Sequence, residues 1–599
     1  MSERRLWTQP DLPALGPALF ILGCIFIGLG LDSYPQYVLA VALISMVVGI
    51  ALVVLVGLAR CITLAAGSIM AIGGYASTLA VINLHMPYLA ALVLAILAGG
   101  AAGWIIAFPG TRFRGHNLAM VTLVFQSVAI ILIREATWLT GGAEGIHVPP
   151  PEILGHTITS DQAFLILIGT ASAAMTLAVT ILVRGSFGKN LQAAAGHEIA
   201  AEAFGVSVRG YLTAAFIISS VVIAFAGALL APRVRILDPD SFGVLDSVFM
   251  LAYPIIGGMH SVWGGLLGGG GLRILPELLR PVADYQELFF AALVIFVVMF
   301  FPGGLTELIR RTSPFKQNPT RVSASTPALP ASPAVSFKTA KRADGLLVVE
   351  GIDKHFEALH AVHAASLTVL PGGIHGLIGP NGAGKTSLFN IISGFLDADR
   401  GRVAFAGISL LELRPRDRIG LGITRTFQNV AVFGQLSCLD NVIIGLGRNA
   451  VTRAMVASLD HFVGGTATQD DRCRALAALE AVGLAGQAFS LAGSLSLGEQ
   501  RRLEIARAIV SQPRLILLDE PVSGVAVTET DELRELLIRI NADRNIAMLV
   551  VEHNIPFVAK LCQTLSVMGA GRVVAEGSPA EVISLPIVRQ LYFGEQAAA

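Results

Sequence analysis

The stretch that decides the fold of the C-terminal part of this chain reads Gly379-Pro380-Asn381-Gly382-Ala383-Gly384-Lys385-Thr386. It follows an apolar segment at 374–378 that predicts a short buried strand, and a predicted helix begins near Ser387. Glycines at this spacing let backbone N–H groups close around a phosphate at a helix N-terminus, and Lys385 adds a positive charge for the β- and γ-phosphates. Thr386 is then placed to hold Mg²⁺. A plain glycine-rich turn would not need Lys and Thr at this spacing, so we expect residues 379–387 to bind a nucleotide.

Composition divides the chain into two unlike parts. The chain has 599 residues, is 54% hydrophobic and 14% charged, and is formally neutral. Residues 1–311 contain 31 Asp, Glu, Lys and Arg, and the rest of the chain contains 53. We therefore expect a membrane domain at 1–311, a soluble domain at 346–599, and no nucleic-acid partner, because no net positive charge favours one. The five cysteines show no CxxC pair and no metal-ligand spacing, so they imply neither a disulfide framework nor a zinc site.

Residues 312–345 are the expected linker. They contain five prolines among Ser, Thr and Ala residues, a composition that cannot bury a core. As a flexible coil, a segment of this length reaches on the order of 30 Å. We interpret it as a plain spacer between the two domains.

Apolar stretches long enough to cross a bilayer recur along the first domain. The expected spans are 14–31, 37–59, 62–83, 88–108, 116–137, 162–184, 212–232 and 286–302. With the N-terminus in the cytoplasm, ten of the fifteen Lys and Arg of this domain fall in the inside gaps. The positive-inside rule therefore predicts a multi-pass protein whose C-terminal domain is cytoplasmic, where ATP is.

Two segments of the membrane domain need separate interpretation. The stretch 243–283 is apolar but broken by glycines, which permit close helix packing or a re-entrant segment, so it contains zero or two crossings. The inside loop at 198–205 has helical spacing of small and apolar residues, with Gly205 as a stop. It has too few basic residues for a helix lying on lipid, so we expect it to dock into the soluble domain.

The soluble domain has further motifs for phosphate chemistry. The run Arg514-Leu515-Ile516-Leu517-Leu518-Asp519-Glu520 predicts a buried parallel strand ending in two carboxylates. Asp519 can hold the Mg²⁺ shell and Glu520 can polarise the attacking water. Upstream, Leu495-Ser496-Leu497-Gly498-Glu499-Gln500 opens a predicted helix, where Ser496 and Glu499 also form an ordinary capping box.

Together these motifs resemble the ABC transporter ATPases over roughly 346–595. The phosphate loop, Gln428, the 495–500 signature, Asp519-Glu520 and His553 occur in that family's order and spacing. The resemblance implies that Phe356 stacks on adenine and that His553 orients the γ-phosphate. It also implies that Gln428 senses the γ-phosphate, contributes to the Mg²⁺ site and contacts the membrane domain. Ser496 and Gly498 would complete the ATP site of an opposing domain.

The closer resemblance is to branched-chain amino-acid importers, with permease and ATPase fused in one chain. Its residues in the ATPase are Arg425-Thr426-Phe427-Gln428-Asn429, Leu503 to Ala508 and Ala575 to Val582, and those in the permease are Arg114 to Leu123, Leu139 to Gly142, Glu198 to Gly205, Pro239 to Gly243 and Phe301 to Leu305. The implied fold is a helical transmembrane permease followed by an α/β P-loop ABC ATPase domain. The implied cofactors are ATP and Mg²⁺.

This sequence departs from that family at two places. Gly524-Val525-Ala526-Val527 stands where the family has Gly-Leu-Asn-Pro, so Ala526 replaces an Asn that reaches across the ATPase dimer. Residues 61–67 replace the permease's Ser-Leu-Gly-His stretch, which leaves urea, short amides and aromatic acids open as cargo beside branched-chain amino acids. An exporter half-transporter is a rival reading, but such proteins have six long helices. An ATP-gated channel is a second rival, against which Glu520 and His553 weigh.

We therefore expect an ATP hydrolase coupled to import of a small solute across the bacterial inner membrane. The resemblance implies three partners: a second permease, a second ATPase subunit and a periplasmic solute-binding protein. One chain carries one phosphate loop and one signature, so the smallest working assembly has two nucleotide domains.

Overall fold

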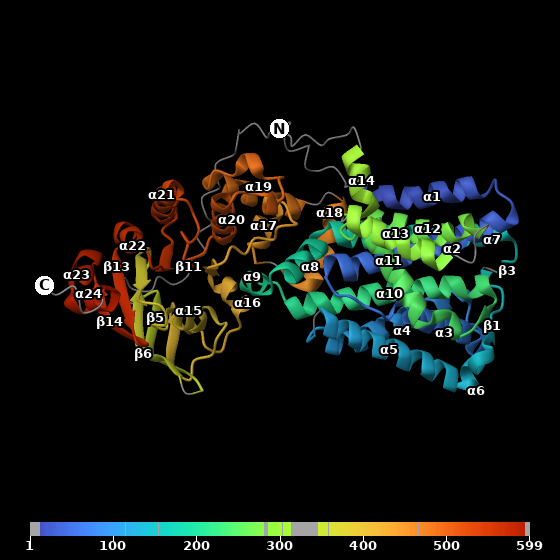
Figure 1. Ribbon diagram of the computed structural model, residues 1–599, viewed down its shortest axis with the longest axis horizontal. Coiled ribbons are helices and arrows are strands. Elements are labelled where there is room, and N and C mark those ends of the chain that lie inside the picture. Colours follow the sequence, from blue (N-terminus) through green and yellow to red (C-terminus); the bar gives the residue numbers. More distant parts are fainter. Residues whose placement is uncertain are drawn as a thin grey trace. The chain divides into compact units, whose positions relative to one another are not determined.

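The computed structural model describes residues 12–113, 115–153, 155–280, 286–301, 303–312, 345–357, 359–447, 449–463 and 466–593. These residues form two compact units, each discontinuous in sequence (Figure 1). Among the described residues, the first unit comprises 12–195, 208–312 and 451–463, and the second comprises 196–207, 345–450 and 466–593.

The first unit is helical. Its principal helices are α1 Gly16–Gly28, α2 Ser33–Leu52, α3 Ala66–Leu84, α4 Tyr88–Gly110, α5 His116–Glu135, α7 Asp161–Arg184, α8 Ser186–Gly196, α10 Val208–Val234, α11 Val244–Gly257, α12 Val262–Leu278, α13 Gln286–Phe300, α14 Gly304–Thr312 and α18 Val451–Val463. Figure 1 shows α3, α4, α5 and α10 running side by side. The connections of this unit contain two antiparallel pairs of short strands. β1 Ile146–His147 pairs with β4 Ile236–Leu237, and β2 Glu152–Ile153 pairs with β3 His156–Thr157.

Seven helices among the described residues are long and apolar enough to cross a membrane. They cover Ser33–Leu58, Ala66–Leu84, Tyr88–Gly110, His116–Glu135, Asp161–Arg184, Val208–Val234 and Asp240–Gly257. Six of them coincide with expected spans, and the seventh lies where the sequence left the number of crossings open. The first and last expected spans correspond to the shorter apolar helices Gly16–Gly28 and Ala291–Phe300.

Close helix packing explains the glycines of the 243–283 stretch. A Cβ atom added at Gly265 of α12 would lie 2.7 Å from the carbonyl carbon of Gly49 in α2. One added at Gly268 would lie 1.9 Å from the carbonyl oxygen of Tyr253 in α11. Because no side chain fits at either place, the glycines let α12 approach both neighbours at backbone contact. The stretch therefore forms two packed helices, α11 and α12.

The second unit is built on two sheets. The six-stranded sheet has the order β10-β11-β12-β7-β13-β14, with β10 Ile423–Arg425, β11 Leu515–Asp519, β12 Ala547–Val551, β7 Ile374–Ile378, β13 Thr564–Gly569 and β14 Arg572–Gly577. All of its pairs are parallel except β13 with β14. The antiparallel sheet has the order β6-β5-β8-β9, with β6 Leu359–Val369, β5 Leu347–Phe356, β8 Arg400–Phe405 and β9 Ile408–Ser409.

Continuous apolar runs form the central strands of the parallel sheet because both of its faces are covered. Every residue of β7, β11 and β12 is buried. Ile516 and Leu518 belong to one hydrophobic core, and Leu515 and Leu517 belong to the other. Side chains of a strand alternate between its faces, so these two cores lie on opposite sides of the sheet. The strand expected at 374–378 is present with those bounds.

Helices complete the second unit. They are α9 Glu198–Ala203, α15 Lys385–Ser393, α16 Pro415–Arg418, α17 Cys438–Ile444, α19 Thr466–Ala481, α20 Leu497–Ile509, α21 Val527–Arg544, α22 Ile555–Leu561, α23 Pro579–Ser584 and α24 Pro586–Phe593. The helix α9 comes from the loop between α8 and α10, so a segment bounded by two helices of the first unit packs within the second.

Candidate functional site

Four of the motifs follow four adjacent parallel strands at the same edge of the sheet. The phosphate loop follows β7, Gln428 comes shortly after β10, Glu520 follows β11 and His553 comes shortly after β12. Asp519 pairs with Val551 in the ladder, and Val551 pairs with Leu377. Carboxyl ends of parallel strands meet at one edge, where ligands of such sheets bind. Segments up to 174 residues apart in sequence, from Gly379 to His553, therefore meet in one place.

Backbone carbonyl groups of the phosphate loop bind the side chain of the loop's own lysine. Gly384 has φ 95° and precedes α15, whose first residue is Lys385. The Lys385 ammonium donates hydrogen bonds to the carbonyl oxygens of Gly379 at 2.6 Å and Pro380 at 2.9 Å. Burial lowers the pKa of this ammonium, and the carboxylates of Glu520 and Asp519 oppose the shift. The charge is thus held at the N-terminus of α15, where an anion is favoured.

The remaining residues of the predicted loop lie around that lysine. Thr386 and Ser387 are in the first turn of α15, where Thr386 is exposed and Ser387 is partly buried. Asn381 and Gly382 are exposed, whereas Ala383 is buried. A Cβ atom at Gly384 would lie 2.3 Å from the carbonyl oxygen of Ala361 in β6. Only glycine fits there, because the left-handed backbone and the close strand both exclude a side chain.

Asp519 is buried and paired with an arginine. The Arg425 guanidinium donates to Asp519 Oδ2 at 3.1 Å. Burial raises the pKa of Asp519, and the Arg425 charge lowers it. Arg425 also lies over the rings of Phe389 and Phe427, at 4.6 and 5.1 Å to their centroids. Arg425 was not among the site residues predicted from the sequence. The feature that could have indicated it is a positively charged residue at the end of β10, beside a strand that ends in a carboxylate.

Glu520 lies within reach of two further predicted residues. Gln428 Nε2 donates to Glu520 Oε2 at 3.0 Å, and His553 Nδ1 lies 3.9 Å from the same oxygen. Glu520 itself has φ 44°, a left-handed conformation that is uncommon for a residue with a side chain. The backbone is therefore held in an unusual conformation where the carboxylate leaves the strand, as often occurs at functional sites.

A neighbouring carboxylate, that of Glu552, connects two loops at this edge. The sequence did not predict this role. Glu552 is fully buried and accepts hydrogen bonds from the backbone N–H groups of Val522, His553 and Asn554, at 3.2, 3.0 and 3.2 Å. It therefore ties the loop after β12, which carries His553, to the loop after β11. The available signal was a carboxylate directly after an apolar strand and directly before His553.

The other predicted nucleotide residues lie on separate elements. Phe356 ends β5 and is 42% exposed. Ser496 caps α20, accepting from the Glu499 N–H at 3.3 Å while Glu499 accepts from the Ser496 N–H at 2.9 Å. The capping box expected from the sequence is therefore present. A Cβ atom at Gly498 would lie 2.6 Å from a carboxylate oxygen of Glu529 in α21. Ser496 and Gly498 thus occupy a helix N-terminus other than that of α15.

A buried ionic cluster on α20 connects the Gln428 segment with α9. Arg501 donates to the carbonyl oxygens of Phe427 and Gln428 and to Glu504, the last at 3.0 Å. Glu504 also accepts from the N–H of Ala431 at 2.8 Å. Since Arg501 and Glu504 are almost fully buried, this cluster holds the backbone around Gln428 rigidly against α20.

The α9 side of the same cluster is formed by Arg507. Its guanidinium is buried 4.7 Å from the ring centroid of Phe204 and donates to the carbonyl oxygen of Ala431 at 2.9 Å. Burial lowers the pKa of Arg507 to about 10, which leaves it charged near neutral pH. Asn449 Nδ2 donates to the Phe204 carbonyl at 2.8 Å. Phe204 is thus held by a cation and by a hydrogen bond within the second unit.

In the first unit, side chains cap the start of α3. Thr122 accepts from the N–H of Leu64, Ser247 from that of Gly67 and Gln126 from that of Ser68, at 3.0, 2.9 and 2.6 Å. These N–H groups lack intrahelical partners, so the polar side chains satisfy them inside an apolar bundle. This capped segment overlaps residues 61–67, where the sequence departs from the permease pattern.

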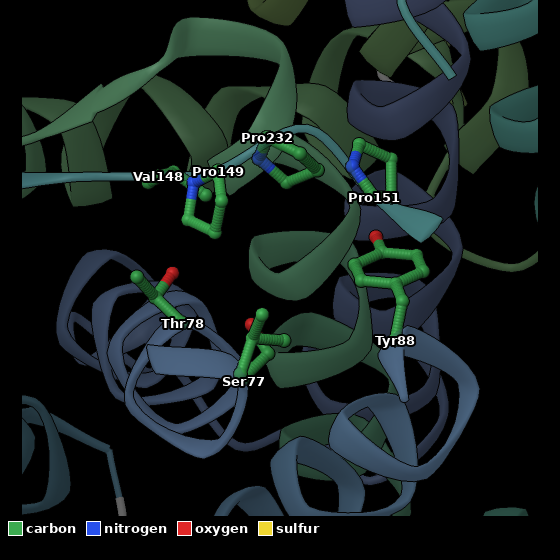
Figure 2. Close-up of a pocket in the computed structure, with 8 residues that line it drawn as sticks. Ser77, Thr78, Tyr88, Val148, Pro149, Pro151 and Pro232 are labelled. Atoms are coloured by element: carbon green, nitrogen blue, oxygen red, sulfur yellow. The ribbon is translucent and has the colours of Figure 1, made fainter. Parts of the chain in front are cut away.

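A small cavity lies elsewhere in this unit. Figure 2 shows Ser77, Thr78 and Tyr88 facing Pro149 and Pro151. The cavity measures about 10 Å³, room for about one water molecule. The Tyr88 hydroxyl donates to Ala228 O at 2.9 Å, whereas the buried Thr78 hydroxyl has no protein partner in the described part of the chain. A water would satisfy Thr78, but a solute would not fit.

Comparison with known proteins identifies both parts of the chain. Residues 362–523 match the ABC transporter family, and residues 34–300 match the family described as branched-chain amino acid transport system / permease component. The high-affinity branched-chain amino acid transport ATP-binding protein BraF of Pseudomonas aeruginosa is 32% identical over 250 residues, covering 42% of this chain and 98% of that protein. LivG of Escherichia coli K12, with the same description, is 34% identical with the same coverage.

Other transport ATPases are similar too. The phosphonates import ATP-binding protein PhnC 2 of Rhodopseudomonas palustris is 36% identical, covering 41% of this chain and 89% of that protein. Among solved structures, the ADP conformation of an ATP-binding cassette of an ABC transporter is 30% identical, covering 42% of this chain and all of that one, with a TM-score of 0.36.

The second unit is thus an ATP-binding cassette ATPase with its motifs at the carboxyl edge of a parallel sheet. The chain belongs to the ABC transporters of branched-chain amino acid type and carries their permease and their ATPase in one polypeptide. It is an ATP hydrolase coupled to transport, as the resemblance implied.

Proposed function

We propose that this chain imports branched-chain amino acids or a chemically related small solute across the bacterial inner membrane, with its ATPase in the cytoplasm. One observation carries this proposal. Lys385, Asp519 and Glu520 lie together at the carboxyl edge of the parallel sheet, in a chain that also contains the permease. The excess of basic residues in the inside gaps supports the orientation. The boundaries proposed for the functional parts are 1–311, 312–345 and 346–599.

The proposed chemistry assigns one task to each side chain. Lys385 exchanges its carbonyl partners for phosphate oxygens of ATP, and Glu520 orients and polarises the attacking water. Gln428, which holds Glu520 at 3.0 Å, and His553 at 3.9 Å position that carboxylate and the γ-phosphate.

The residues present fit Mg²⁺, a hard cation that prefers oxygen ligands. Asp519, whose Oδ2 is held by Arg425, the exposed Thr386 hydroxyl and the Gln428 side chain would hold the ion. When bound, the ion would neutralise charge on the β- and γ-phosphates.

Coupling of hydrolysis to transport is proposed to run through α9. This helix belongs to the permease sequence but packs in the ATPase unit, with Phe204 against Arg507. Arg507 and Arg501 lie on the same helix, and Arg501 bonds the backbone of Gln428. A movement of Gln428 on γ-phosphate binding is therefore transmitted to α9 through a rigid buried cluster.

The assembly proposed is heteromeric. In ABC ATPases the signature helix of one domain completes the nucleotide site of the other, and here the capped N-terminus of α20 is the part that would do so. The importer family pairs two permeases with two ATPases, and Ala526 in place of Asn suggests unequal sites. A second permease, a second ATPase and a periplasmic solute-binding protein are the proposed partners.

Two substitutions separate binding from hydrolysis. In the purified full chain, Lys385→Ala should weaken ATP binding, whereas Glu520→Gln should leave ATP bound and reduce hydrolysis by at least 100-fold. Glu412→Gln, at an exposed position outside the site, is the control and should leave both unchanged. Wild-type hydrolysis by the Glu520→Gln chain would show that Glu520 is not the group that activates water.

The identity of the cargo and the subunit composition of the assembly are tested by reconstitution. The chain is placed in liposomes alone and with candidate permease, ATPase and binding-protein partners, and uptake of leucine, urea, a short amide and an aromatic acid is compared. ATP-dependent uptake of leucine only with the partners supports the proposal. Uptake by the chain alone would overturn the heteromeric assembly, and selective uptake of urea, the amide or the aromatic acid would overturn branched-chain amino acids as the cargo.

A further inference from the structure

Three side chains of types that can bind a metal ion meet on the hairpin of β5 and β6, away from the predicted catalytic residues. Asp353 comes from β5, and His360 and His363 come from β6. Asp353 Oδ1 lies 3.0 Å from His360 Nε2 and 3.6 Å from His363 Nδ1, and the two ring nitrogens lie 3.2 Å apart. The three atoms thus form a nearly regular triangle.

This triangle has the size of one face of a zinc coordination tetrahedron. Zinc binds nitrogen and carboxylate oxygen at about 2.0–2.2 Å, so neighbouring ligand atoms lie roughly 3.3–3.6 Å apart. His363 Nδ1 also lies 3.0 Å from His360 Nδ1, over the face of that ring, so the His363 ring must turn for one ion to reach all three atoms. Two imidazoles and one carboxylate are also a donor set that zinc uses in proteins, with the fourth position left to water.

Surrounding groups hold two of the ligands in place. Asp353 Oδ1 accepts from the N–H of Ala364 at 3.1 Å. The ring of His360 stacks on that of His355, with centroids 3.9 Å apart, and the His355 N–H donates to Asp399 at 2.6 Å. Such outer contacts fix ligand orientation in metal sites. The side chains of Asp353, His360 and His363 are 22–35% exposed, so an ion can enter from solvent.

We propose that Asp353, His360 and His363 form a site for a divalent transition metal of the zinc type. Its ligands come from both strands, so the ion clamps the hairpin near its turn. Phe356 pairs with Leu359 at that turn. If Phe356 stacks on adenine, as the resemblance to the ABC transporter ATPases implies, the clamp fixes the base-binding side chain and metal raises ATP affinity.

Binding of Co²⁺ to the nucleotide-free full chain in detergent tests the site. The protein carries a tag without histidines and is first treated with a chelator. The wild type should bind one Co²⁺ with the visible absorption of a four-coordinate ion, and Zn²⁺ should displace it. His360→Ala and His363→Ala should each weaken binding at least 10-fold. Asp353→Asn should do the same while keeping an acceptor for Ala364.

The control is His147→Ala, an exposed histidine in the first unit, which should bind like wild type. Thermal unfolding of every variant shows whether the chain is folded. Absence of a bound ion in the wild type, or unchanged binding in Asp353→Asn and both histidine variants, would overturn the site. Zinc should lower the Kd for ATP in wild type but not in His363→Ala. An unchanged Kd with the ion bound would overturn the clamp alone, and leave both the metal site and the proposed transport activity standing.

Discussion

Acidification should destabilise the ATPase unit through one buried histidine. His375 lies in β7, the strand that leads into the phosphate loop, between β12 and β13. Its ring nitrogens contact the hydroxyls of Ser566 at 2.8 Å and Thr564 at 2.9 Å. Burial lowers the pKa of His375 from 6.5 to about 4. The neutral imidazole is therefore the form that the folded protein retains.

The sign and size of the effect follow from proton linkage. Below pH 6.5 the unfolded chain binds a proton at this histidine and the folded chain does not, until about pH 4. Stability from His375 is thus fully present above pH 6.5 and is lost as the pH falls toward 4. Between pH 7 and pH 5 the expected loss in free energy of unfolding is about 2 kcal/mol.

Urea unfolding of the full chain measures this loss. The four tryptophans all lie before residue 264, so brief proteolysis with detection of a C-terminal tag is the suitable assay for the ATPase. With an m-value of about 3 kcal/mol/M, the midpoint should fall by roughly 0.6 M between pH 7 and pH 5. His375→Gln keeps a polar side chain but cannot titrate. The fall in its urea midpoint should therefore be smaller than that of the wild type by roughly 0.6 M. His147→Gln, at an exposed site, should behave as wild type. Equal shifts in wild type and His375→Gln would refute the reasoning.

Three further substitutions test the site. Ala526→Asn should stabilise the ATPase unit by about 1 kcal/mol in the same assay, because Ala526 is the N-cap of α21 and offers no side-chain acceptor. It should also raise the hydrolysis rate or leave it unchanged, and a clear drop would mean that alanine is adapted to this position. Phe204→Asp should permit ATP hydrolysis but abolish uptake in liposomes, since it removes the ring against Arg507. Ile199→Asp, at an exposed position of α9, the helix that Phe204 directly follows, should retain coupling, and equal loss in both would contradict the role of the Phe204 contact. Glu552→Gln should lower kcat about 10-fold with little change in KM for ATP, because it loosens the loop of His553, and a change in KM alone would rule out that positioning role.

Local sequence was sufficient for the elements of the ATPase. The apolar run at 374–378 is a strand with those bounds, and the glycine-lysine motif after it opens α15. Ser496 caps α20 as its spacing with Glu499 predicts. These features depend on residues within a few positions of each other, so short-range pattern is enough to predict them.

Residues that act through distant partners were missed. Arg425 matters because β10 lies beside β11, which brings it to Asp519, 94 residues away. Glu552 matters because its carboxylate also reaches the N–H of Val522. Neither residue belongs to a local pattern that specifies a buried partner. Their roles arise only when the order of strands in the sheet is known.

The sequence by itself determined the two classes of domain, the nucleotide chemistry and most of the apolar helices, because composition and short motifs carry that information. Tertiary structure alone decided that the glycines at 257–271 serve close helix packing. Gly265, for example, packs against the backbone of Gly49, more than 200 residues earlier. It also brought Asp353 to His360 and His363, through a hairpin whose register is irregular and cannot be counted from strand alternation. The physical reason is common to both cases. Backbone approach and ligand geometry depend on which surfaces are in contact, and contact between surfaces is a property of the packed chain rather than of any segment.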